Sequence, residues 1–485
     1  MNIVYLLTDQ WRYDALGCNG AKVCKTPNID ALASQGCRFT GAYTTNPLCS
    51  PARASIMTGL YPHHHGQLAN TGNFNAVFDK QVLDKKSYAV YLAENGWNTG
   101  YCGKFHLAGE GSFEQWGFRD WRPEWKFNED LEKKGITYDF GISEVQPLEW
   151  GGDAVFCGPS KLDAQDHHDA WVADQAIDIM EGFAGEDKPF MVCAGFHGPH
   201  FPYAVPEPYC SMYDPDEVER WENFDETFVN KPEVQQKELM RWNTSHLTFK
   251  DWQKVVAVYW GYCTYIDAQV GRIVDWLKEK NLYDDTMIVF SSDHGDMLGG
   301  HRMFNKGFNM YEEDTHIPLV VKMPAGESCV SVCGEYVSLV DIAPTFLDAA
   351  CIGQERQEDG QKNVVTMDGR SVLGLVRGQE KTSKSWRRWL LSEFNGYEST
   401  LVTTRMIRND KWKYIYNPFS VDELYDMESD PAELRNLAPL PGFAHVLRRM
   451  RGTMYEVLKE AGDSIVELSL WQSNSYGLII SPREA

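Results

Sequence analysis

The sequence predicts an α/β fold in which helices flank a large, mainly parallel sheet. Short, continuous apolar stretches with turn or polar residues at their ends alternate with stretches whose apolar residues recur at helical spacing. Continuous apolar stretches are typical of strands buried on both faces. The chain has 485 residues, of which 43% are hydrophobic, so it is long enough for one large core and a smaller appended domain.

The expected elements follow in chain order. Strands are predicted at residues 2–8, 188–196, 286–292 and 317–323, and helices at 26–36, 169–183 and 252–280. Residues 110–168 and 204–250 are rich in Gly, Pro, Trp and charge, and we expect them to form long insertions over the sheet. In folds of this kind, ligands bind at the carboxyl ends of the strands.

The C-terminal part is predicted to be a separate, smaller unit. We expect residues 1–380 to form the main domain and residues 381–485 an α+β subdomain. Alternation over 405–417 predicts a small antiparallel sheet, and helical spacing over 442–462 predicts a helix that covers it. Residues 470–485 either reach back over the site or join a subunit contact in a homo-oligomer, and the sequence leaves both alternatives open.

Charge and cysteine usage narrow the class of protein. The formal net charge of −23 argues against a nucleic-acid partner, since such binding needs clustered Lys and Arg. No apolar run approaches the roughly 18 residues of a membrane span. Twelve cysteines are scattered without a C-x-x-C pair, which favours reduced thiols and a cytoplasmic location. The N-terminal run is too short for a signal peptide and is predicted to be a buried strand, although a leader removed by processing remains an alternative.

Two predicted strands end in acidic residues. Asp9 and Gln10 follow the first strand, and Asp293 and His294 follow the strand at 286–292. A single Asp after a strand most often caps a loop. Two such ends, each with a second donor, instead favour a divalent-metal site made of carboxylates, an amide oxygen and one imidazole.

Cys49, in the stretch NPLCSPARASIMTG, is expected at the N-terminus of a helix. Pro51 suits the first helical position and Gly59 suits the end. Free amides and the helix dipole attract an anion there, and Arg53, one turn along, adds a positive charge. A reactive thiolate and a buried structural cysteine are both compatible with this position.

The segment LCSPARASIMTG resembles the signature of the sulfatase family, in which the cysteine is oxidised to Cα-formylglycine. Further segments resemble family motifs in family order over nearly the whole chain: NIVYLLTDQ, TPNIDALASQGCRFTGAY, GYCGKFHLAG, GFHGPHFPY, SSDHGDMLGGHRMFNKGFNMYEEDTHIPLVV and DELYDMESDPAELRNLA. The resemblance implies the alkaline phosphatase-like sandwich. It also implies hydrolysis of a sulfate monoester, with a sulfated carbohydrate or small alcohol as substrate.

The resemblance implies a role for each matched residue. The metal ligands are expected to be Asp9, Gln10, residue 49, Asp293 and His294. Arg53 is expected to hold the modified residue, and Lys104 and Lys306 to grip the sulfate oxygens. His106 is expected to take a proton from the covalent hemiacetal sulfate, and His200 to contact the sulfate and protonate the leaving oxygen. A formylglycine-generating maturation enzyme is an implied partner.

Departures from the family pattern leave the metal and the substrate less defined. Many sulfatases have Asp where this chain has Gln10 and Asn where it has His294. The Gln and His pair also resembles the phosphonate monoester hydrolases, which act on phosphonates and phosphate diesters, so that activity is the alternative. Ca²⁺ is expected for an oxygen-rich site, and Mn²⁺ or Zn²⁺ if the imidazole decides. Gly300 replaces the usual glutamate.

Several other residues have two interpretations. The run His63–His65 suggests a metal, but adjacent side chains point apart, so a structural role or a place at the rim of the pocket is expected. His167, His168 and Asp169 either line a substrate pocket or form a solvated helix start. Trp116, Trp121, Trp125 and Trp150 suit sugar stacking and core packing equally.

Overall fold

The computed structural model describes most of the chain. The described ranges are 1–71, 85–107, 113–136, 149–150, 154–155, 157–353, 366–379, 386–397, 400–418 and 420–467. The predicted role of the C-terminal segment 470–485 lies outside the described residues, as does the side chain of Trp150.

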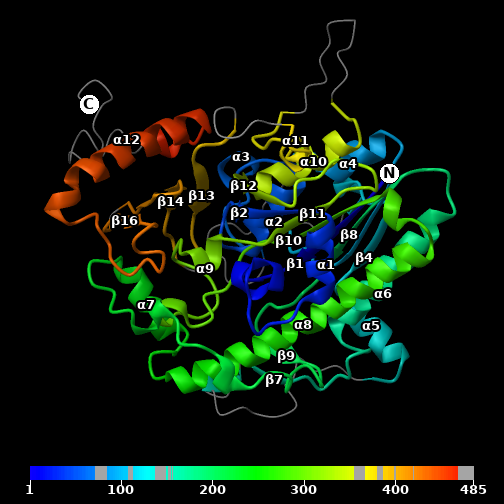
Figure 1. Cartoon of the computed structure of the whole chain (residues 1–485), viewed down its shortest axis with the longest axis horizontal. Coiled ribbons are helices and arrows are strands. Elements are labelled where there is room, and N and C mark those ends of the chain that lie inside the picture. The colour runs from blue at the N-terminus through cyan, green and yellow to red at the C-terminus, as the bar shows by residue number, and fades with distance from the viewer. Residues whose placement is uncertain are drawn as a thin grey trace, which may run out of the picture.

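A large sheet forms the centre of the molecule (Figure 1). Its eight strands lie in the order β12-β2-β11-β10-β1-β8-β3-β4. Their bounds are β1 Asn2–Thr8, β2 Cys37–Tyr43, β3 Asn98–Gly103, β4 Asp120–Pro123, β8 Phe190–Gly195, β10 Thr286–Ser292, β11 Leu319–Lys322 and β12 Val332–Ser338. Strand β11 runs antiparallel to both neighbours, whereas the other neighbouring pairs are parallel. The predicted mainly parallel sheet is confirmed.

Helices cover both faces of this sheet. On one side are α1 Pro27–Gln35, α6 His168–Ala184 and α8 Phe249–Glu279; on the other are α2 Cys49–Thr58, α4 Tyr88–Glu94 and α10 Ile342–Ala349. Successive side chains of β1 point to opposite faces of the sheet, because a strand is pleated. Val4 and Leu6 pack into the first core, and Ile3, Tyr5 and Leu7 into the second. The predicted α/β sandwich is therefore the observed fold.

The expected helices at 26–36, 169–183 and 252–280 correspond to α1, α6 and α8. The description of 110–168 as an insertion over the sheet is wrong in part, because β4 joins the sheet edge beside β3. A four-residue strand that contains Arg and Pro lacks the apolar run on which the prediction relied. The other α-helices and strands before the C-terminal subdomain are α3 Pro62–His65, α5 Lys126–Lys133, α7 Glu233–Arg241, α9 Glu312–Thr315, α11 Leu373–Val376, β5 Glu149–Trp150, β6 Ala154–Val155, β7 Cys157–Pro159 and β9 Tyr203–Val205.

The C-terminal subdomain is a small sheet with one long helix beside it (Figure 1). Its antiparallel strands lie in the order β13-β14-β15-β16, with bounds β13 Leu390–Phe394, β14 Thr404–Arg408, β15 Trp412–Tyr416 and β16 Glu423–Asp426. Helix α12, Ala444–Glu460, packs its buried face on this sheet through Met450 and Met454. The predicted α+β subdomain is confirmed, while the boundary at residue 380 stays a prediction.

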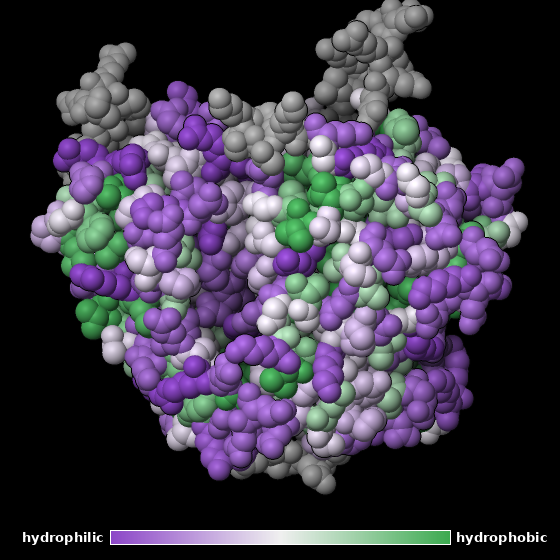
Figure 2. All heavy atoms as spheres, in the orientation of Figure 1, coloured by the Kyte–Doolittle hydropathy of each residue, from purple (hydrophilic) through white to green (hydrophobic). Residues whose placement is uncertain are grey.

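The visible surface is mainly hydrophilic. Figure 2 shows apolar residues scattered among polar ones, with a hollow between the C-terminal subdomain and the central part of the molecule. Among the described residues, no helix is both long enough and apolar enough to cross a membrane.

Candidate active site

The loops that carry most of the predicted site residues leave the sheet side by side. Strands β10, β1, β8 and β3 are neighbours and run parallel, so their carboxyl ends meet at one edge. The residues that follow these ends are Asp293 and His294, Asp9 and Gln10, His200, and Lys104 and His106. Topology alone therefore gathers side chains that lie far apart in the sequence.

Helix α2 brings Cys49 to this edge. The helix begins at Cys49, with Leu48 as its N-cap, and ends before Gly59, whose φ of 69° is left-handed. The expected start at Pro51 is wrong by two residues. Proline is tolerated at the third helical position, because the first amides of a helix have no acceptor within it.

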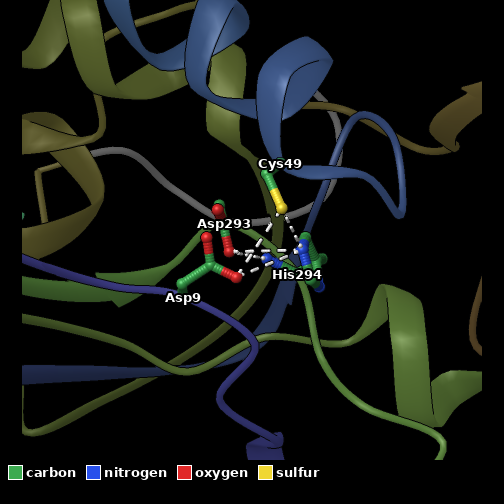
Figure 3. A group of neighbouring side chains, drawn as sticks. All are labelled: Asp9, Cys49, Asp293 and His294. Carbon is green, nitrogen blue, oxygen red and sulfur yellow. Dashed lines mark hydrogen bonds and ion pairs between the residues drawn. The ribbon is translucent and has the colours of Figure 1, made fainter. Parts of the chain in front are cut away.

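Four side chains converge on one point (Figure 3). Those of Asp9, Cys49, Asp293 and His294 are fully buried, and one ligand atom of each lies within 4.8 Å of the others. His294 Nε2 lies 3.6 Å from Asp9 Oδ1 and 3.6 Å from Asp293 Oδ1, and 3.3 Å from Cys49 Sγ. We call these four residues the first cluster.

Arg53 joins the two carboxylates of the first cluster. Its Nε donates to Asp293 Oδ2 at 2.8 Å, and its Nη2 donates to Asp9 Oδ2 at 3.1 Å. Its Nη1 donates to the carbonyl oxygen of Lys104 at 2.6 Å. The guanidinium is fully buried, so these bonds balance its charge and fix the orientation of both carboxylates.

Two buried lysines flank the first cluster. Lys104 Nζ lies 2.9 Å from Asp9 Oδ2, and Lys306 Nζ lies 3.0 Å from Cys49 Sγ. The ammonium of Lys306 also lies 3.9 Å from Asp9 Oδ1. Arg53, Lys104 and Lys306 thus surround the two carboxylates of Asp9 and Asp293. The excess of positive charge favours an anionic ligand.

The position of Lys104 depends on close approach between two strands. The preceding residue, Gly103, has a φ of +87°, and a Cβ there would lie 2.1 Å from the carbonyl oxygen of Gly195. A side chain therefore does not fit at residue 103. Lys104 N then donates to the same carbonyl oxygen at 2.8 Å, which extends the pairing of β3 and β8 to the site.

Gln10 lies beside the first cluster with its two side-chain atoms used differently. Its Oε1 accepts from Lys306 Nζ at 3.0 Å, and its Nε2 donates to Asp296 Oδ2 at 2.6 Å. Tyr203 also donates to that carboxylate. Sequence reasoning missed Asp296, although it lies three residues after Asp293 in the segment SSDHGD. It orients the amide so that the carbonyl oxygen faces the site.

His200 lies beside the first cluster, whereas His106 contacts Ser50, the residue next to Cys49 in the chain. His200 Nε2 lies 4.0 Å from Asp9 Oδ1. His106 Nε2 lies 3.3 Å from the carbonyl oxygen of Thr71, and the His106 carbonyl accepts from Ser50 Oγ at 2.6 Å. Within the described residues, His106 Nδ1 is buried without a hydrogen-bond partner.

The charges of the site shift several pKa values. Burial raises the pKa of the Asp9 carboxyl, but Lys104 and further cations outweigh burial and hold this pKa well below its usual range. Burial and Asp9 also oppose ionisation of Cys49, yet Lys306 and Lys104 lower the pKa of its thiol well below the usual value. The site therefore stabilises negative charge at residue 49.

The other two shifts concern the imidazoles. Burial lowers the pKa of a histidine, but Asp293 outweighs burial at His294 and raises its pKa to about 9. Burial, Lys104 and Lys306 together lower the pKa of His200 to about 3, so this ring is neutral at pH 7. A cation bound by His294 must displace its proton.

The first cluster has the donors and the spacing for a divalent metal ion. Two carboxylate oxygens and one imidazole nitrogen face a common point. The amide oxygen of Gln10 and the sulfur of Cys49 each lie 3.0 Å from the same ammonium nitrogen, that of Lys306. Ligand atoms that share an ion at about 2.0–2.4 Å lie roughly 3 Å apart. The 3.6 Å separations at His294 need only small movements to reach that value.

The three consecutive histidines do not converge on one point. His63 contacts Glu393, His64 contacts Asp368 and His65 contacts Ser55. The rings diverge onto three separate partners, as the sequence predicts.

The other open interpretations are partly decided. His167, His168 and Asp169 are buried, so a solvated helix start is wrong. Trp116 and Trp121 pack in the core with Phe105, whereas the side chain of Trp125 is about half exposed.

The fold and the site define a hydrolase of anionic esters. A family model described as Sulfatase matches residues 1–352, and one described as N-sulphoglucosamine sulphohydrolase, C-terminal, matches residues 299–460. The chain therefore belongs to the sulfatase family, within the alkaline phosphatase superfamily, and it is a sulfuric ester hydrolase. Membership implies a divalent metal ion and a formylglycine residue.

Individual relatives align over almost the full chain. The uncharacterized sulfatase YidJ of Escherichia coli strain K12 is 28% identical over 95% of this chain and 88% of its own. The N-acetylglucosamine-6-O-sulfatase of Bacteroides thetaiotaomicron is 25% identical over 96% of this chain and 87% of its own. Among solved structures, the phosphonate monoester hydrolase of Agrobacterium radiobacter has a TM-score of 0.79 at 24% identity, covering 95% of this chain and 96% of that one. That last likeness concerns the fold.

Proposed function

We propose that this chain hydrolyses sulfate monoesters of carbohydrates or small alcohols, with residue 49 in its formylglycine form as the nucleophile. The observation that carries the proposal is the positive charge around Cys49: Lys306 Nζ lies 3.0 Å from its sulfur, and His294 Nε2 lies 3.3 Å from it. The sulfur stands in for a hydroxyl oxygen of the hydrated aldehyde. An oxygen there would have its negative charge stabilised by Lys306 and by the metal ion that His294 would help to hold.

The metal ion would be held by Asp9, Gln10, residue 49, Asp293 and His294. When bound, such an ion lowers the pKa of a coordinated hydroxyl and offsets charge on an anionic ester. Because carboxylate and amide oxygens predominate, we favour Ca²⁺, with Mn²⁺ or Zn²⁺ as the alternative if the imidazole nitrogen that faces the carboxylates decides. Reconstitution of the metal-free protein with each ion separates these alternatives.

The cationic side chains would position the sulfate. All three nitrogens of the Arg53 guanidinium donate to the two carboxylates and the Lys104 carbonyl. Arg53 would therefore hold these groups in place and would not contact the ester. Lys104 and Lys306 approach the first cluster from different loops and would each take a sulfate oxygen. His200 would contact the leaving oxygen.

His106 would act in the second half of the reaction. Its backbone is bonded to Ser50, the neighbour of residue 49, and its Nδ1 is unpaired within the described part of the chain. A base beside the second hydroxyl of residue 49 is what regeneration of the aldehyde requires. The modified residue itself requires a maturation enzyme as a partner, which recognises the segment around Cys49.

A sulfated saccharide is the substrate class that the relatives favour. The Bacteroides thetaiotaomicron relative is named for N-acetylglucosamine 6-O-sulfate, and it aligns over 96% of this chain. We carry over the class of sulfated saccharide and leave the sugar and the sulfate position unassigned.

Hydrolysis of phosphonate monoesters or phosphate diesters is the second candidate. It is favoured by the Gln10 and His294 pair and by the likeness in fold to the Agrobacterium radiobacter enzyme. A phosphonate carries an organic group where sulfate has a bare oxygen. Lys104 and Lys306 are both buried, at 5% and 2% exposure, so a site closed by two lysines should disfavour that group.

A matched pair of substrates tests the proposal. We expect kcat/KM for 4-nitrophenyl sulfate to exceed that for 4-nitrophenyl phenylphosphonate by at least about tenfold, roughly 1.4 kcal/mol of transition-state preference. The Cys49→Ala variant, prepared in parallel, should lose both activities, which assigns them to this site. Equal or faster turnover of the phosphonate would overturn the preference for sulfate.

A further inference from the structure

A second group of metal-ligand side chains lies outside the first cluster. Glu124 follows β4, His168 begins α6 and His197 follows β8, so three separate elements bring them together. One ligand atom of each lies within 4.8 Å of the others. We call these three residues the second cluster.

The distances in the second cluster are short enough for its side chains to share an ion. His197 Nδ1 is hydrogen-bonded to Glu124 Oε1 at 2.8 Å, and His168 Nε2 lies 3.5 Å from the same oxygen, so an ion would take the place of the shared hydrogen. Ligands at about 2.0–2.1 Å from a tetrahedral Zn²⁺ lie roughly 3.3 Å apart. The two separations bracket that value, so small side-chain movements are enough.

The ring of His168 is buried beside two carboxylates, those of Glu124 and Asp169. The residue is 9% exposed, and within the part of the chain that the structure describes neither ring nitrogen has a hydrogen-bond partner. Buried polar groups in folded proteins are almost always satisfied. A metal ion bound by Nε2, the nitrogen that faces Glu124, would satisfy this ring.

A buried carboxylate, that of Asp169, lies near the ring nitrogen of His168 that does not face Glu124. Asp169 is fully buried, and its Oδ1 lies 3.8 Å from His168 Nδ1. The backbone amide of His197 and the hydroxyl of Tyr262 hold this carboxylate in place, at 2.8 and 2.9 Å. A metal-bound histidine usually turns its other ring nitrogen toward such a carboxylate.

Charge also favours a divalent cation in the second cluster. Glu124 and Asp169 are two carboxylates beside imidazoles that bind a metal only in their unprotonated form, so a divalent cation would balance the carboxylate charges. Among the described residues, no lysine or arginine lies within ion-pair distance of Glu124.

A third group of possible metal ligands, around His63, differs from the second cluster because a cation is already present. Around His63, the carboxylates of Glu393 and Asp463 already have a cation, because Arg405 lies 3.5 and 2.5 Å from them. That group therefore has no need of a metal ion.

We propose that the second cluster binds a second divalent transition-metal ion, Zn²⁺ by its ligand type, separate from the ion of the first cluster. The ligands are His168 Nε2, His197 Nδ1 and the carboxylate of Glu124. Three protein ligands leave a coordination position open. The ring of His197 lies 5.3 Å from the ring of His200, so the second cluster lies beside a residue assigned to the ester.

Zinc binding to the metal-free, full-length protein tests this proposal. Calorimetric titration with Zn²⁺ alone is carried out on Asp293→Asn, in which the first cluster is disabled, and on the double variants that add Glu124→Gln or His168→Gln. Asp293→Asn with His246→Gln, which changes an exposed histidine, is the matched control. Glu124 is 39% exposed at its side chain, so its replacement by Gln should leave the fold intact, which circular dichroism checks.

We expect Asp293→Asn and its His246→Gln control to bind one Zn²⁺ per chain with equal affinity. Each double variant in the second cluster should bind it at least about 100-fold more weakly. Visible absorption of the Co²⁺ form should likewise require both Glu124 and His168. Zn²⁺ affinities that are equal in all four proteins, or no binding to Asp293→Asn, would overturn the proposal.

Discussion

The ammonium nitrogen of Lys306 lies 3.0 Å from the sulfur of Cys49, although 257 positions separate the two residues. The same ammonium donates to Gln10 Oε1 at 3.0 Å. Lys306 is 2% exposed, and a buried lysine keeps its charge only where anionic or polar partners surround it. Its place against residue 49 is what a site for an anionic nucleophile and an anionic ester requires.

Removal of that charge should slow the reaction strongly. We expect Lys306→Ala to lower kcat/KM for an aryl sulfate by about 10²- to 10³-fold, the usual cost of losing one group that stabilises transition-state charge. Lys306→Arg, which keeps the charge at a different reach, should lie in between. Lys278→Ala, on the exposed face of α8, is the control. Activity of Lys306→Ala within threefold of the control would contradict the role assigned to this residue.

Loss of a carboxylate from the first cluster should remove metal and turnover together. Asp293→Asn breaks the ion pair with Arg53 and takes a charged ligand from the site. We expect its metal content and its kcat to fall in parallel, with KM changed much less. The measurement is elemental analysis beside steady-state kinetics. Wild-type protein that keeps full activity after chelation and dialysis would show that the first cluster is not a metal site.

Metal affinity should also depend on pH. Asp293 raises the pKa of His294 to about 9, so a proton competes with the ion for this ring below that pH. Affinity should therefore increase as the pH rises from 6 toward 9, and calorimetry at several pH values measures it. The slope should flatten in His294→Asn, which carries no titrating ring. A slope that is the same in both proteins would assign the proton to another group.

The role of His200 should show in the leaving group. Nδ1 faces the carbonyl oxygen of Phe201 and so carries the hydrogen, which leaves Nε2 as an acceptor while the pKa is about 3. His200 can act as an acid only once an anionic ester raises that pKa. We expect His200→Ala to slow sugar sulfates by about 10²-fold and nitrophenyl sulfate much less, because only the former need a proton. Equal losses would leave His200 as a binding group alone.

Stability should depend on the charge of His63. Burial opposes protonation of this ring, but Glu393 outweighs burial and raises its pKa from 6.5 to about 9. The residue joins α3 to β13 and, through the Ala461 carbonyl, to the end of α12. A raised folded-state pKa stabilises the protein fully below pH 6.5, and this contribution is lost as the pH rises through about 9.

The effect is on the order of 3 kcal/mol, from the size of the pKa shift. Urea unfolding at pH 6 and pH 9.5 measures it. The free energy of unfolding of the wild-type protein should fall more between these values than that of His63→Gln. His64→Gln, whose ring is more exposed, serves as the control. An identical pH dependence in wild type and His63→Gln would refute the assignment.

Residues that directly follow apolar strands were the predictable part of the site. Asp9 and Asp293 each come after a run of buried residues, and parallel strands put their carboxyl ends at one edge. Lys104 was reached only through the family resemblance. Its strand, β3, reads NTGYCG and has two glycines and a threonine in place of an apolar run.

The supporting contacts could not be predicted, because they depend on tertiary structure. Glu124 meets His197 from 73 positions away, and nothing in the sequence near either residue indicates the other. Asp296 was in view within SSDHGD, but its task of orienting Gln10 follows only from the left-handed φ of 68° at Gln10 and the distance between the two side chains. In the same way, the buried state of His168 follows from packing against Phe127 and Trp171.

The central claim is that residue 49 acts as an oxygen nucleophile and not as a thiol. Mass spectrometry of the peptide that contains residue 49, in preparations that differ in specific activity, tests it most directly. We predict that the fraction of this peptide that carries the aldehyde rises in proportion to kcat per chain, with the proportionality passing through zero. Full activity in a preparation whose residue 49 is entirely cysteine would contradict the account.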